Sequence, residues 1–539
     1  MATLTQKSDI SFFSSSDIAK LTTTEISALT KTQLQSFTAS MAAGLTEKQL
    51  AVIPVKYLPS DVFPDLSLKA LSSLPLSSIS TEQLNALTSE QVASLSSVQI
   101  ASLSKIQVNS MDSDHLAAIA MPALSGLSLT LLSSDHFALL QPSQISALTI
   151  SQISGLTTKQ TIGLTPEQAT ALTSLQALSF TTSALNALTG DAIKGLSATF
   201  IAALPSKSFA ALTTSQLTAF DEEQIVFLSS AQIAALSSSQ IHVFDDKIAS
   251  LSTTALQGLT TKNIAGLKLE ALSEEGFSAL SAKQFSGLQS EQIAKIDEHY
   301  AALLTSSDIA ALSSSQIKSL PIDSIATLEP EAFSGFNSKN ISGLSSNSSS
   351  DQISKLSSDQ AAFLKPAAVS HLSSAQLSQL TADSVLNLNL DSFKALPSST
   401  FGLLPKSVFS SLSSEQIHAM TTAQLSQLST DQIRSLGVDQ VSALSTQQIA
   451  KLTANQLGAI AAETVSAIPS EIFKAIPSTV VSAIASAAFA LLPAETIQAL
   501  TPSQVSALTT KQLSKFGIEQ TSSLKATQVA KLGAEQIGA

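Results

Sequence analysis

Hydrophobic and polar residues recur along the chain with a period of eight. Three consecutive repeats, covering Thr421–Leu444, show the pattern: TTAQLSQL, STDQIRSL and GVDQVSAL. Position 1 is Ser, Thr or Gly, position 4 is Gln, and positions 5 and 8 are aliphatic. A fixed period over most of a chain is typical of a repeat architecture, which grows by adding repeats instead of enlarging one core.

Each octad has the features of one short capped helix. In Ser429–Leu436, the Ser429 hydroxyl can accept from the backbone N–H of Gln432, and the Gln432 side chain can return a bond, which forms a capping box. Ile433 and Leu436 then lie on one helical face. Proline falls mainly at the cap or the first helical position, where a helix tolerates it: Pro205, Pro397, Pro405, Pro469 and Pro493, and Pro142, Pro166, Pro330 and Pro502.

Two other folds fit the pattern less well. In one continuous helix the apolar pair would drift by about 80° per octad, so the apolar stripe would spiral and bury nothing. In a β-solenoid, positions 5 and 8 would point to opposite faces of a strand. The sequence also has only 18 Gly for tight turns.

A helix of about six residues is unstable alone and must pack against neighbours. We therefore predict an all-α fold: a solenoid of very short capped helices, one per eight-residue repeat. Positions 5 and 8 form its core, a small residue at position 7 allows close approach, and positions 2, 3 and 6 face water. The sequence leaves open how many octads complete one coil.

The repeat covers nearly the whole sequence, so we expect a single continuous octad-repeat solenoid over 1–539. Irregular repeats stand at 54–71, 128–132, 245–251, 268–272 and 345–356. The first region holds two five-residue repeats, Pro54–Leu58 and Ser67–Leu71. Each five-residue repeat lacks the first three positions of an octad but keeps both apolar anchors, which indicates that the anchors are indispensable. Ser345–Leu356 gains four polar residues, which predicts a loop insertion.

Phenylalanine recurs at position 5, at Phe137, Phe209, Phe277, Phe333, Phe401 and Phe473. We interpret these residues as filling wider places in the core. The alternative is a recurring bend, or an ancestral block of eight to nine octads.

Composition narrows the functional classes. Apolar residues make up 44% of the chain, which argues against disorder, and charged residues only 13%, which predicts a weakly charged Ser/Thr/Gln surface. The net charge is −12 and Arg434 is the sole arginine, so we expect no nucleic-acid partner.

No apolar run is long enough for a transmembrane segment. Without a visible Sec signal, we expect an extracellular or cell-surface location reached by another route, with the cytoplasm as the alternative.

No set of residues indicates catalysis, a cofactor or a metal. Cysteine is absent, and no P-loop, GxGxxG or calcium-loop motif occurs. We expect no catalytic, cofactor-binding or metal site, and no enzyme activity. The histidines fall at mixed octad positions, far apart in sequence: His115, His136, His242, His299, His371 and His418.

Acidic clusters stand at Asp221–Glu223, Asp245–Asp246 and Asp297–Tyr300. We interpret all three as solvated helix starts, because carboxylates are favoured in the first turn of a helix. Cation binding by Asp297–Tyr300 is the alternative.

The pattern (Ser/Thr)-x-x-Gln-(Ile/Leu/Val)-x-x-Leu resembles octapeptide-repeat arrays of large bacterial surface or secreted proteins of the adhesin-like kind. The resemblance implies a non-enzymatic role. We expect a structural protein that assembles with itself, head-to-tail or laterally, into filaments or surface arrays, because its surface is weakly charged and its terminal repeats look like internal ones. The alternative is a binding scaffold, an adhesin or effector, for a protein or glycan. Ice or mineral binding is disfavoured because many octads carry Ser instead of Thr.

Overall fold

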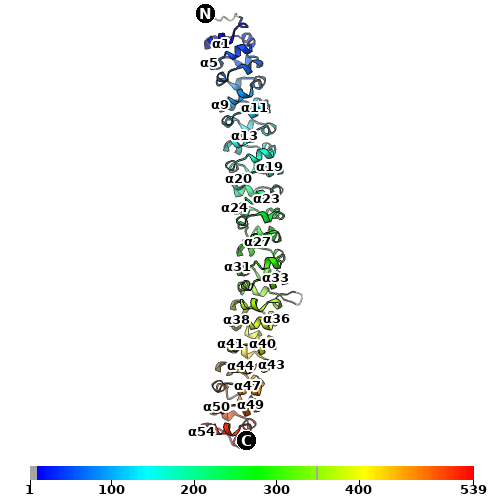
Figure 1. Ribbon diagram of the computed structural model, residues 1–539, viewed down its shortest axis with the longest axis vertical. Coiled ribbons are helices and arrows are strands. Elements are labelled where there is room, and N and C mark those ends of the chain that lie inside the picture. Colours follow the sequence, from blue (N-terminus) through cyan, green and yellow to red (C-terminus); the bar gives the residue numbers. More distant parts are fainter. Residues whose placement is uncertain (1–8, 348–349) are drawn as a thin grey trace. The chain divides into compact units, whose positions relative to one another are not determined.

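The computed structural model describes residues 9–347 and 350–539 and is all-helical, as the octads predict. Each α-helix has four to six residues and belongs to one octad. The chain divides into two compact units, Met1–Leu267 and Lys268–Ala539, and within each unit the helices stack in successive coils (Figure 1). The first predicted repeat, Gln6–Phe13, begins outside the described residues.

The α-helices of the first unit are α1 (Ser15–Lys20), α2 (Thr23–Ser27), α3 (Lys31–Gln35), α4 (Ala39–Ala43), α5 (Glu47–Leu50), α6 (Leu68–Leu71), α7 (Thr81–Asn85), α8 (Ser89–Ala93), α9 (Ser97–Ala101), α10 (Lys105–Val108), α11 (Ser113–Ala118), α12 (Ser134–Ala138), α13 (Pro142–Ala147), α14 (Ile150–Ser154), α15 (Thr158–Ile162), α16 (Pro166–Thr170), α17 (Ser174–Ala177), α18 (Thr182–Leu185), α19 (Gly190–Gly195), α20 (Ala198–Ala203), α21 (Ser206–Ala210), α22 (Thr214–Thr218), α23 (Glu222–Ile225), α24 (Ser230–Ala235), α25 (Ser238–His242) and α26 (Thr253–Leu256).

Those of the second unit are α27 (Glu274–Ser278), α28 (Ala282–Phe285), α29 (Ser290–Ile293), α30 (Glu298–Ala301), α31 (Ser306–Ala311), α32 (Ser314–Ser319), α33 (Ile322–Thr327), α34 (Ser358–Ala362), α35 (Pro366–Val369), α36 (Ser374–Gln379), α37 (Ala382–Leu386), α38 (Leu390–Ala395), α39 (Ser398–Phe401), α40 (Lys406–Ser411), α41 (Ser414–Ala419), α42 (Thr422–Ser426), α43 (Thr430–Arg434), α44 (Val438–Ser442), α45 (Thr446–Ile449), α46 (Ala454–Ala459), α47 (Ala462–Ser466), α48 (Ser470–Phe473), α49 (Ser486–Leu491), α50 (Ala494–Ala499), α51 (Pro502–Ala507), α52 (Thr510–Leu513), α53 (Ile518–Ser522), α54 (Ala526–Val529) and α55 (Ala534–Ile537).

Several octads and short repeats form 3-10 helices instead: η1 (Val55–Tyr57), η2 (Ser60–Asp65), η3 (Leu76–Ser78), η4 (Met121–Gly126), η5 (Leu129–Leu131), η6 (Ile248–Ser250), η7 (Ile264–Gly266), η8 (Leu269–Ala271), η9 (Pro330–Gly335), η10 (Ile341–Gly343), η11 (Ile353–Lys355) and η12 (Val481–Ala483). Two strands, β1 (Ser346–Asn347) and β2 (Ser350–Asp351), pair antiparallel.

The helices begin at the predicted capping boxes. Before α43, the Ser429 N–H donates to Gln432 Oε1 at 2.8 Å, and Gln432 N–H donates to Ser429 Oγ at 3.2 Å. Pro142, Pro166 and Pro502 stand at the first helical position, where no intrahelical N–H bond is lost. The octad therefore encodes its own helix start.

The core contains more of each octad than positions 5 and 8. In the octad Ser429–Leu436, Ile433 is 1% and Leu436 4% exposed, but Gln432 at position 4 is also only 6% exposed. Positions 2, 3 and 6 face solvent, as predicted. The position-5 phenylalanines fill the core, and Phe401 lies 5.8 Å from both Phe393 and Phe409 in edge-to-face contacts of neighbouring octads.

The buried Gln at position 4 links successive coils. Gln440 Nε2 donates to the Phe409 carbonyl at 2.7 Å and to the Leu412 carbonyl at 2.8 Å, which lie 31 and 28 residues earlier. These acceptors are positions 5 and 8 of the fourth preceding octad. The same separations recur in both units, so one coil takes 28 residues, or three and a half octads. We call this position-4 contact the inter-coil bridge.

Inter-coil bridges keep their octad partners across irregular repeats. Beyond the insertion at Ser345–Leu356, Gln376 reaches the carbonyls of Ile341 and Leu344, now 35 and 32 residues away. Gln352 still caps Ser345 although seven residues separate them. The insertion leaves the stack at the β1–β2 pair, and residues 348–349 of the predicted loop lie outside the described residues.

Inter-coil bridges also locate the short repeats. Gln99 donates to Leu71 and Leu74, and Gln107 donates to Leu76 and Ile79. Ser67–Leu74 is therefore a complete octad, and the short repeat is Pro75–Ile79. The expected short repeat at Ser67–Leu71 is wrong. The expectation failed because Ser67 caps α6 without Gln or an acid at position 4: Ser67 Oγ accepts from the Ala70 N–H at 3.3 Å.

The five-residue repeats show how the helix changes when the capping residues are missing. η1, η3, η5 and η8 have no side-chain cap and form only 3-10 helices. Their anchors are nevertheless buried; Val55 is 1% and Leu58 3% exposed. This agrees with the prediction that the anchors are indispensable.

Candidate functional site

Two of the polar residues that stand out in the sequence at position 4, His115 and Tyr300, form inter-coil bridges. His115 Nε2 lies 2.7 Å from the Leu87 carbonyl oxygen, and the Tyr300 hydroxyl donates to the Leu272 carbonyl at 2.6 Å. Other bridging side chains are Lys247, Asn263, Ser324, Asn340, Ser384 and Ser392. Several donor types therefore serve at this position, and His115 and Tyr300 have structural roles.

The other histidines contact separate partners. His136 Nδ1 lies 2.9 Å from Ser133 Oγ, His242 Nδ1 2.9 Å from Asp245, His299 Nε2 3.1 Å from Glu274, His371 Nδ1 3.0 Å from the Ala367 carbonyl, and His418 Nδ1 3.4 Å from the Ala443 carbonyl. Within residues 9–347 and 350–539, no group of three or more His, Asp or Glu side chains could hold a metal ion. The histidines therefore form no common site there.

Two of the acidic clusters lie at helix starts. Asp221 caps α23 and accepts from the Gln224 N–H at 2.8 Å; Asp297 caps α30 and accepts from the Tyr300 N–H at 3.0 Å. Each carboxylate thus satisfies an otherwise unpaired N–H of the first turn.

Carboxylates at position 4 can cap a helix but cannot form an inter-coil bridge. Asp308 is 7% exposed and accepts from the Thr305 N–H and Oγ1–H at 2.9 and 2.6 Å. An ionised carboxylate has no proton to donate to the carbonyls of Phe277 and Leu280 in the previous coil.

We expect Asp308→Gln to raise the free energy of unfolding by about 1 kcal/mol, because the amide adds donors where the carboxylate has none. Urea denaturation followed by circular dichroism measures the change. Asp323→Gln, at an exposed position 3, should change stability by less than about 0.5 kcal/mol. Equal or lower stability of Asp308→Gln would contradict the inter-coil bridge.

Asp17 and Glu25 occupy position 4 in the first coil. Hydrogen bonds from the Ser14 hydroxyl and N–H lower the pKa of Asp17, and bonds from the Thr22 N–H and hydroxyl lower the pKa of Glu25. A carboxyl whose pKa is depressed by folding stabilises the fold above its unfolded pKa, and this contribution is lost as pH falls through the folded value.

Acidification should therefore loosen α1 and α2 before α3, whose box uses the non-titrating Gln33. Hydrogen exchange at pH values from 7 down to below about 4 tests this prediction. Amides of α1 and α2 should lose protection relative to those of α3, after correction for intrinsic exchange rates. Parallel loss in all three helices would show that the acidic caps are not responsible.

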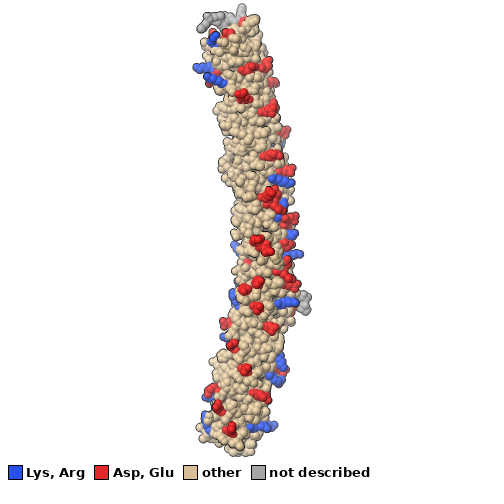
Figure 2. Space-filling model, viewed as in Figure 1, with Lys and Arg blue, Asp and Glu red and all other residues tan. Residues whose placement is uncertain are grey.

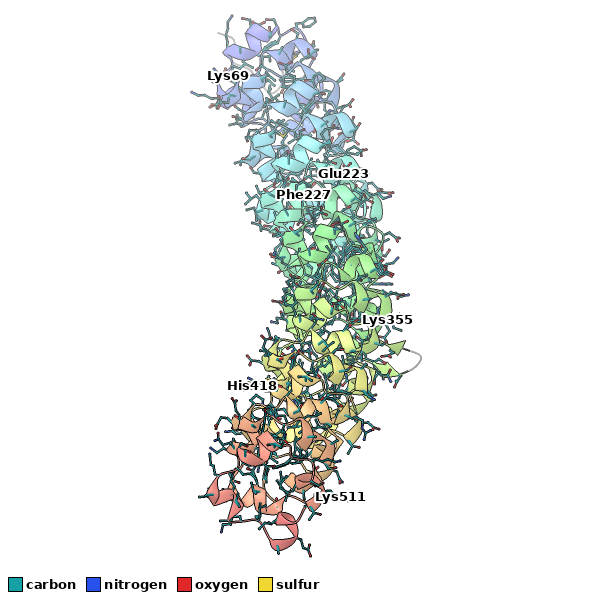
Figure 3. All side chains as sticks on the ribbon, turned by 60° about the horizontal axis from the view of Figure 1, so that its bottom comes forward. Lys69, Glu223, Phe227, Lys355, His418 and Lys511 are labelled. Carbon is teal, nitrogen blue, oxygen red and sulfur yellow. The ribbon has the colours of Figure 1, made fainter. Side chains whose placement is uncertain are left out.

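Acidic side chains follow one side of the first unit, over stacked octads (Figure 2). Asp135, Glu167, Asp191, Glu223 and Asp246 are exposed at position 3 of their octads. Inter-coil bridges from Gln168 and Gln224 and the α16–α19 and α23–η6 contacts join these octads in one series. We call these five residues the acidic ridge; Glu223 is labelled in Figure 3.

Apolar side chains form a second surface of the first unit. Val98, Met121, Ile150, Leu175 and Leu178 are 77%, 43%, 46%, 58% and 59% exposed. The first four stand on α9, η4, α14 and α17, and Leu178 directly follows α17. Helix α9 contacts η4, α14 contacts α17, and Gln152 of α14 bridges to Leu124 of η4. We call these five residues the apolar strip. The sequence signal is aliphatic residues at positions 2, 3 and 6, which are otherwise polar.

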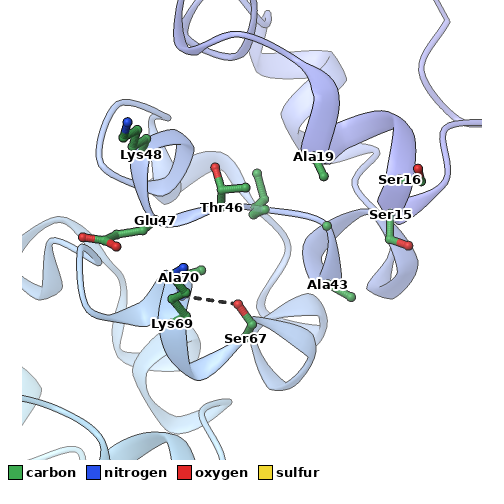
Figure 4. A pocket seen from close by; sticks show the side chains of 12 residues that line it. Ser15, Ser16, Ala19, Ala43, Thr46, Glu47, Lys48, Ser67, Lys69 and Ala70 are labelled. Atoms are coloured by element: carbon green, nitrogen blue, oxygen red, sulfur yellow. Dashed lines mark hydrogen bonds between the residues drawn. The ribbon is translucent and has the colours of Figure 1, made fainter.

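A groove of about 630 Å³ opens near the start of the first unit. The charged side chains of Glu47, Lys48 and Lys69 lie on one side of it, and Ser15 and Ala43 lie on the other (Figure 4). The groove combines cationic, anionic and hydroxyl groups, which suits a polar ligand better than an apolar one.

Comparison with known proteins gives one family match. Three segments match the ALTTAQ repeat. They are residues 67–97, 201–238 and 425–454, and they cover a minor part of the chain. The match supports the repeat character of the sequence. No curated protein matches the chain. None of the helices in the described ranges is long and apolar enough to cross a membrane.

Solved structures resemble the chain only remotely. A homology model of the full-length AP-3 complex in an intermediate open conformation shares 13% identity over 85% of this chain and 84% of its own, with a TM-score of 0.17. The structure of APUM23-deletion-of-insert-region-GGAAUUGACGG shares 13% identity over 78% and 84%, with a TM-score of 0.16. At these TM-scores the similarity carries no argument about function.

Proposed function

We propose that this protein is a non-enzymatic structural repeat protein that associates with itself side by side, into filaments or surface arrays. The apolar strip carries the proposal. Five exposed apolar side chains stand on octads of stacked coils, and groups of exposed apolar side chains on proteins mark sites of association.

A second copy of the chain is the occupant that fits the strip best. Pairing two strips buries apolar side chains on both molecules in one self-complementary contact. The acidic ridge lies on other octads of the coil, so this pairing does not require the two ridges to face each other. With a net charge of −12, contacts that kept the ridges together would be opposed by repulsion.

Sedimentation velocity over a range of protein concentrations tests the proposal. The wild-type chain should form species larger than one molecule, and the double variant Ile150→Ser, Leu178→Ser should weaken association at least tenfold. Val438→Ser, at a 45% exposed apolar position of the second unit, is the matched control and should associate like the wild type. A wild-type chain that stays monomeric at every concentration would rule out self-assembly.

A binding scaffold is the second candidate, and the groove lined by Glu47, Lys48 and Lys69 favours it. A glycan or a polar protein segment could be held there by hydroxyl and charged groups. Retention on a glycan array that Lys48→Ala, Lys69→Ala abolishes would support this role.

A further inference from the structure

We propose that Lys31, Lys56 and Tyr57 form a binding site for the phosphate monoester group of a soluble ligand. Two ammonium groups converge there on one aromatic ring: Lys31 Nζ lies 5.5 Å and Lys56 Nζ 5.1 Å from the centroid of the Tyr57 ring. The ring attracts both cations through its negative face. It therefore gathers two positive charges at one point of the surface.

The short repeat Pro54–Leu58 brings these residues together. Tyr57 stands at position 7, which elsewhere lies against the position-2 residue of the preceding coil, as Gly44 lies against Ser15. The position-2 residue here is Lys31 of α3, and α3 contacts η1. Because most octads carry a small residue at position 7, a tyrosine there puts an aromatic ring beside Lys31.

The two ammonium groups lack an anionic partner in the chain. Among the described residues, neither Lys31 nor Lys56 forms an ion pair, and the half-buried Tyr57 hydroxyl forms no hydrogen bond. Ser80–Leu87 stacks on this repeat through its inter-coil bridge and carries Glu82. The pKa of Glu82 is lowered by hydrogen bonds from its own backbone N–H and from the N-cap hydroxyl. Two cations and one hydroxyl donor are thus left for an anion.

Charge and donor number favour a phosphate monoester as that anion. Such a group carries about −1.5 to −2 charges at pH 7 and three strong acceptor oxygens, which matches two ammonium groups and one hydroxyl. A carboxylate or a sulfate monoester carries a single charge and would leave one ammonium group unpaired. An anionic membrane is a poorer partner, because the net charge of −12 opposes it and each lysine near its surface contributes only about 1 kcal/mol. The site shares no residue with the apolar strip or the groove, so its test is independent of the proposed self-association.

Isothermal titration calorimetry of the full-length chain with glucose 6-phosphate tests the proposal. We expect saturable binding with a Kd of about 1 mM or tighter, and no binding of glucose. The double variant Lys31→Gln, Lys56→Gln should weaken binding about tenfold or more, because it removes both charged donors. Tyr57→Phe keeps the ring but removes the hydroxyl, and should weaken binding about threefold. The matched control Lys105→Gln, Lys159→Gln removes the same charge from exposed lysines of the same unit and should bind like the wild type.

The pH dependence of binding separates a dianion from a monoanion. The second pKa of a phosphate monoester is about 6, so the affinity should fall about tenfold between pH 7 and pH 5 as the dianion becomes scarce. Methyl sulfate, a monoanion at both pH values, should bind more weakly than glucose 6-phosphate at pH 7. Equal binding of the two at pH 7 would contradict a site for a dianion.

Two further results would overturn the proposal: no saturation at about 20 mM glucose 6-phosphate, or an equal loss of affinity in the two lysine double variants. Circular dichroism of each variant confirms that it is folded. Vesicles of phosphatidylcholine and phosphatidic acid in equal amounts present the same phosphate monoester on a membrane. Retention of the chain on these vesicles without binding of glucose 6-phosphate would assign the two lysines to a membrane and contradict a soluble ligand.

Discussion

Replacing Gln424 by Glu is expected to lower the free energy of unfolding by about 3 kcal/mol at neutral pH. Gln424 is 1% exposed; its Oε1 accepts from Thr421 at 2.8 Å, and its Nε2 donates to Phe393, Lys394 and Leu396 at 3.3, 3.1 and 2.9 Å. Glu keeps the size of the side chain and the cap. It replaces the donor by an oxygen that faces three carbonyl oxygens.

The loss of unfolding free energy in Gln424→Glu should become smaller as the pH falls. Burial beside carbonyl oxygens raises the pKa of the new carboxyl group above its unfolded value. The protonated form is then favoured in the folded state, so the variant should recover stability relative to the wild type as pH falls toward about 5. Denaturant unfolding at several pH values measures this trend.

Gln427→Glu is the matched control, because Gln427 lies three residues away and is exposed. It should change stability by less than about 0.5 kcal/mol. If both variants lost the same amount, the general increase in negative charge would explain the effect, and the inter-coil bridge would not.

Gly195→Ala is expected to destabilise the first unit by about 3 kcal/mol. A Cβ at Gly195 would lie 2.3 Å from the Pro166 carbonyl oxygen and 2.8 Å from its Cα, which are backbone atoms of the previous coil. Coils approach closely here because position 4 of the same octad is Ala192, whose short side chain is fully buried. Relief of the clash requires two coils to move apart.

Gly163→Ala is expected to stabilise the first unit. Gly163 also stands at position 7, but its octad has Gln160 at position 4, and the nearest atoms to a new Cβ are 3.5 Å away. Its φ of −82° suits alanine, so the substitution should stabilise by about 0.5 kcal/mol through the unfolded state. Thermal unfolding of both variants tests the contrast, and similar effects at the two sites would contradict the proposed coil spacing.

The octad pattern was sufficient to predict the helix, its cap and its two anchors, because all of these depend on contacts within eight residues. Ser429, Gln432, Ile433 and Leu436 take the predicted roles. The coil of 28 residues was not predicted, because a bond between Gln440 and Leu412 depends on how helices pack and not on the repeat itself.

Two sequence signals of that packing are visible once the structure is known. Gln outnumbers Glu at position 4 although either completes a capping box, and only Gln can also donate. Gly tends to stand at position 7 where position 4 is short, as in Ala123–Gly126 and Ala192–Gly195. The apolar strip depends on the same packing, because its residues stand on octads that only the stacking of successive coils brings together.

The most direct test of the coil is disulfide trapping, since the chain has no cysteine. Ser442 Oγ donates to the Ala467 carbonyl, 25 residues later, at 3.0 Å. The pair Ser442→Cys, Ala467→Cys should therefore cross-link readily under mild oxidation. Ala459→Cys and Ala475→Cys, at the same octad position one repeat earlier and later, should not cross-link with Ser442→Cys. Cross-linking to either of these sites in preference to position 467 would contradict a coil of three and a half octads.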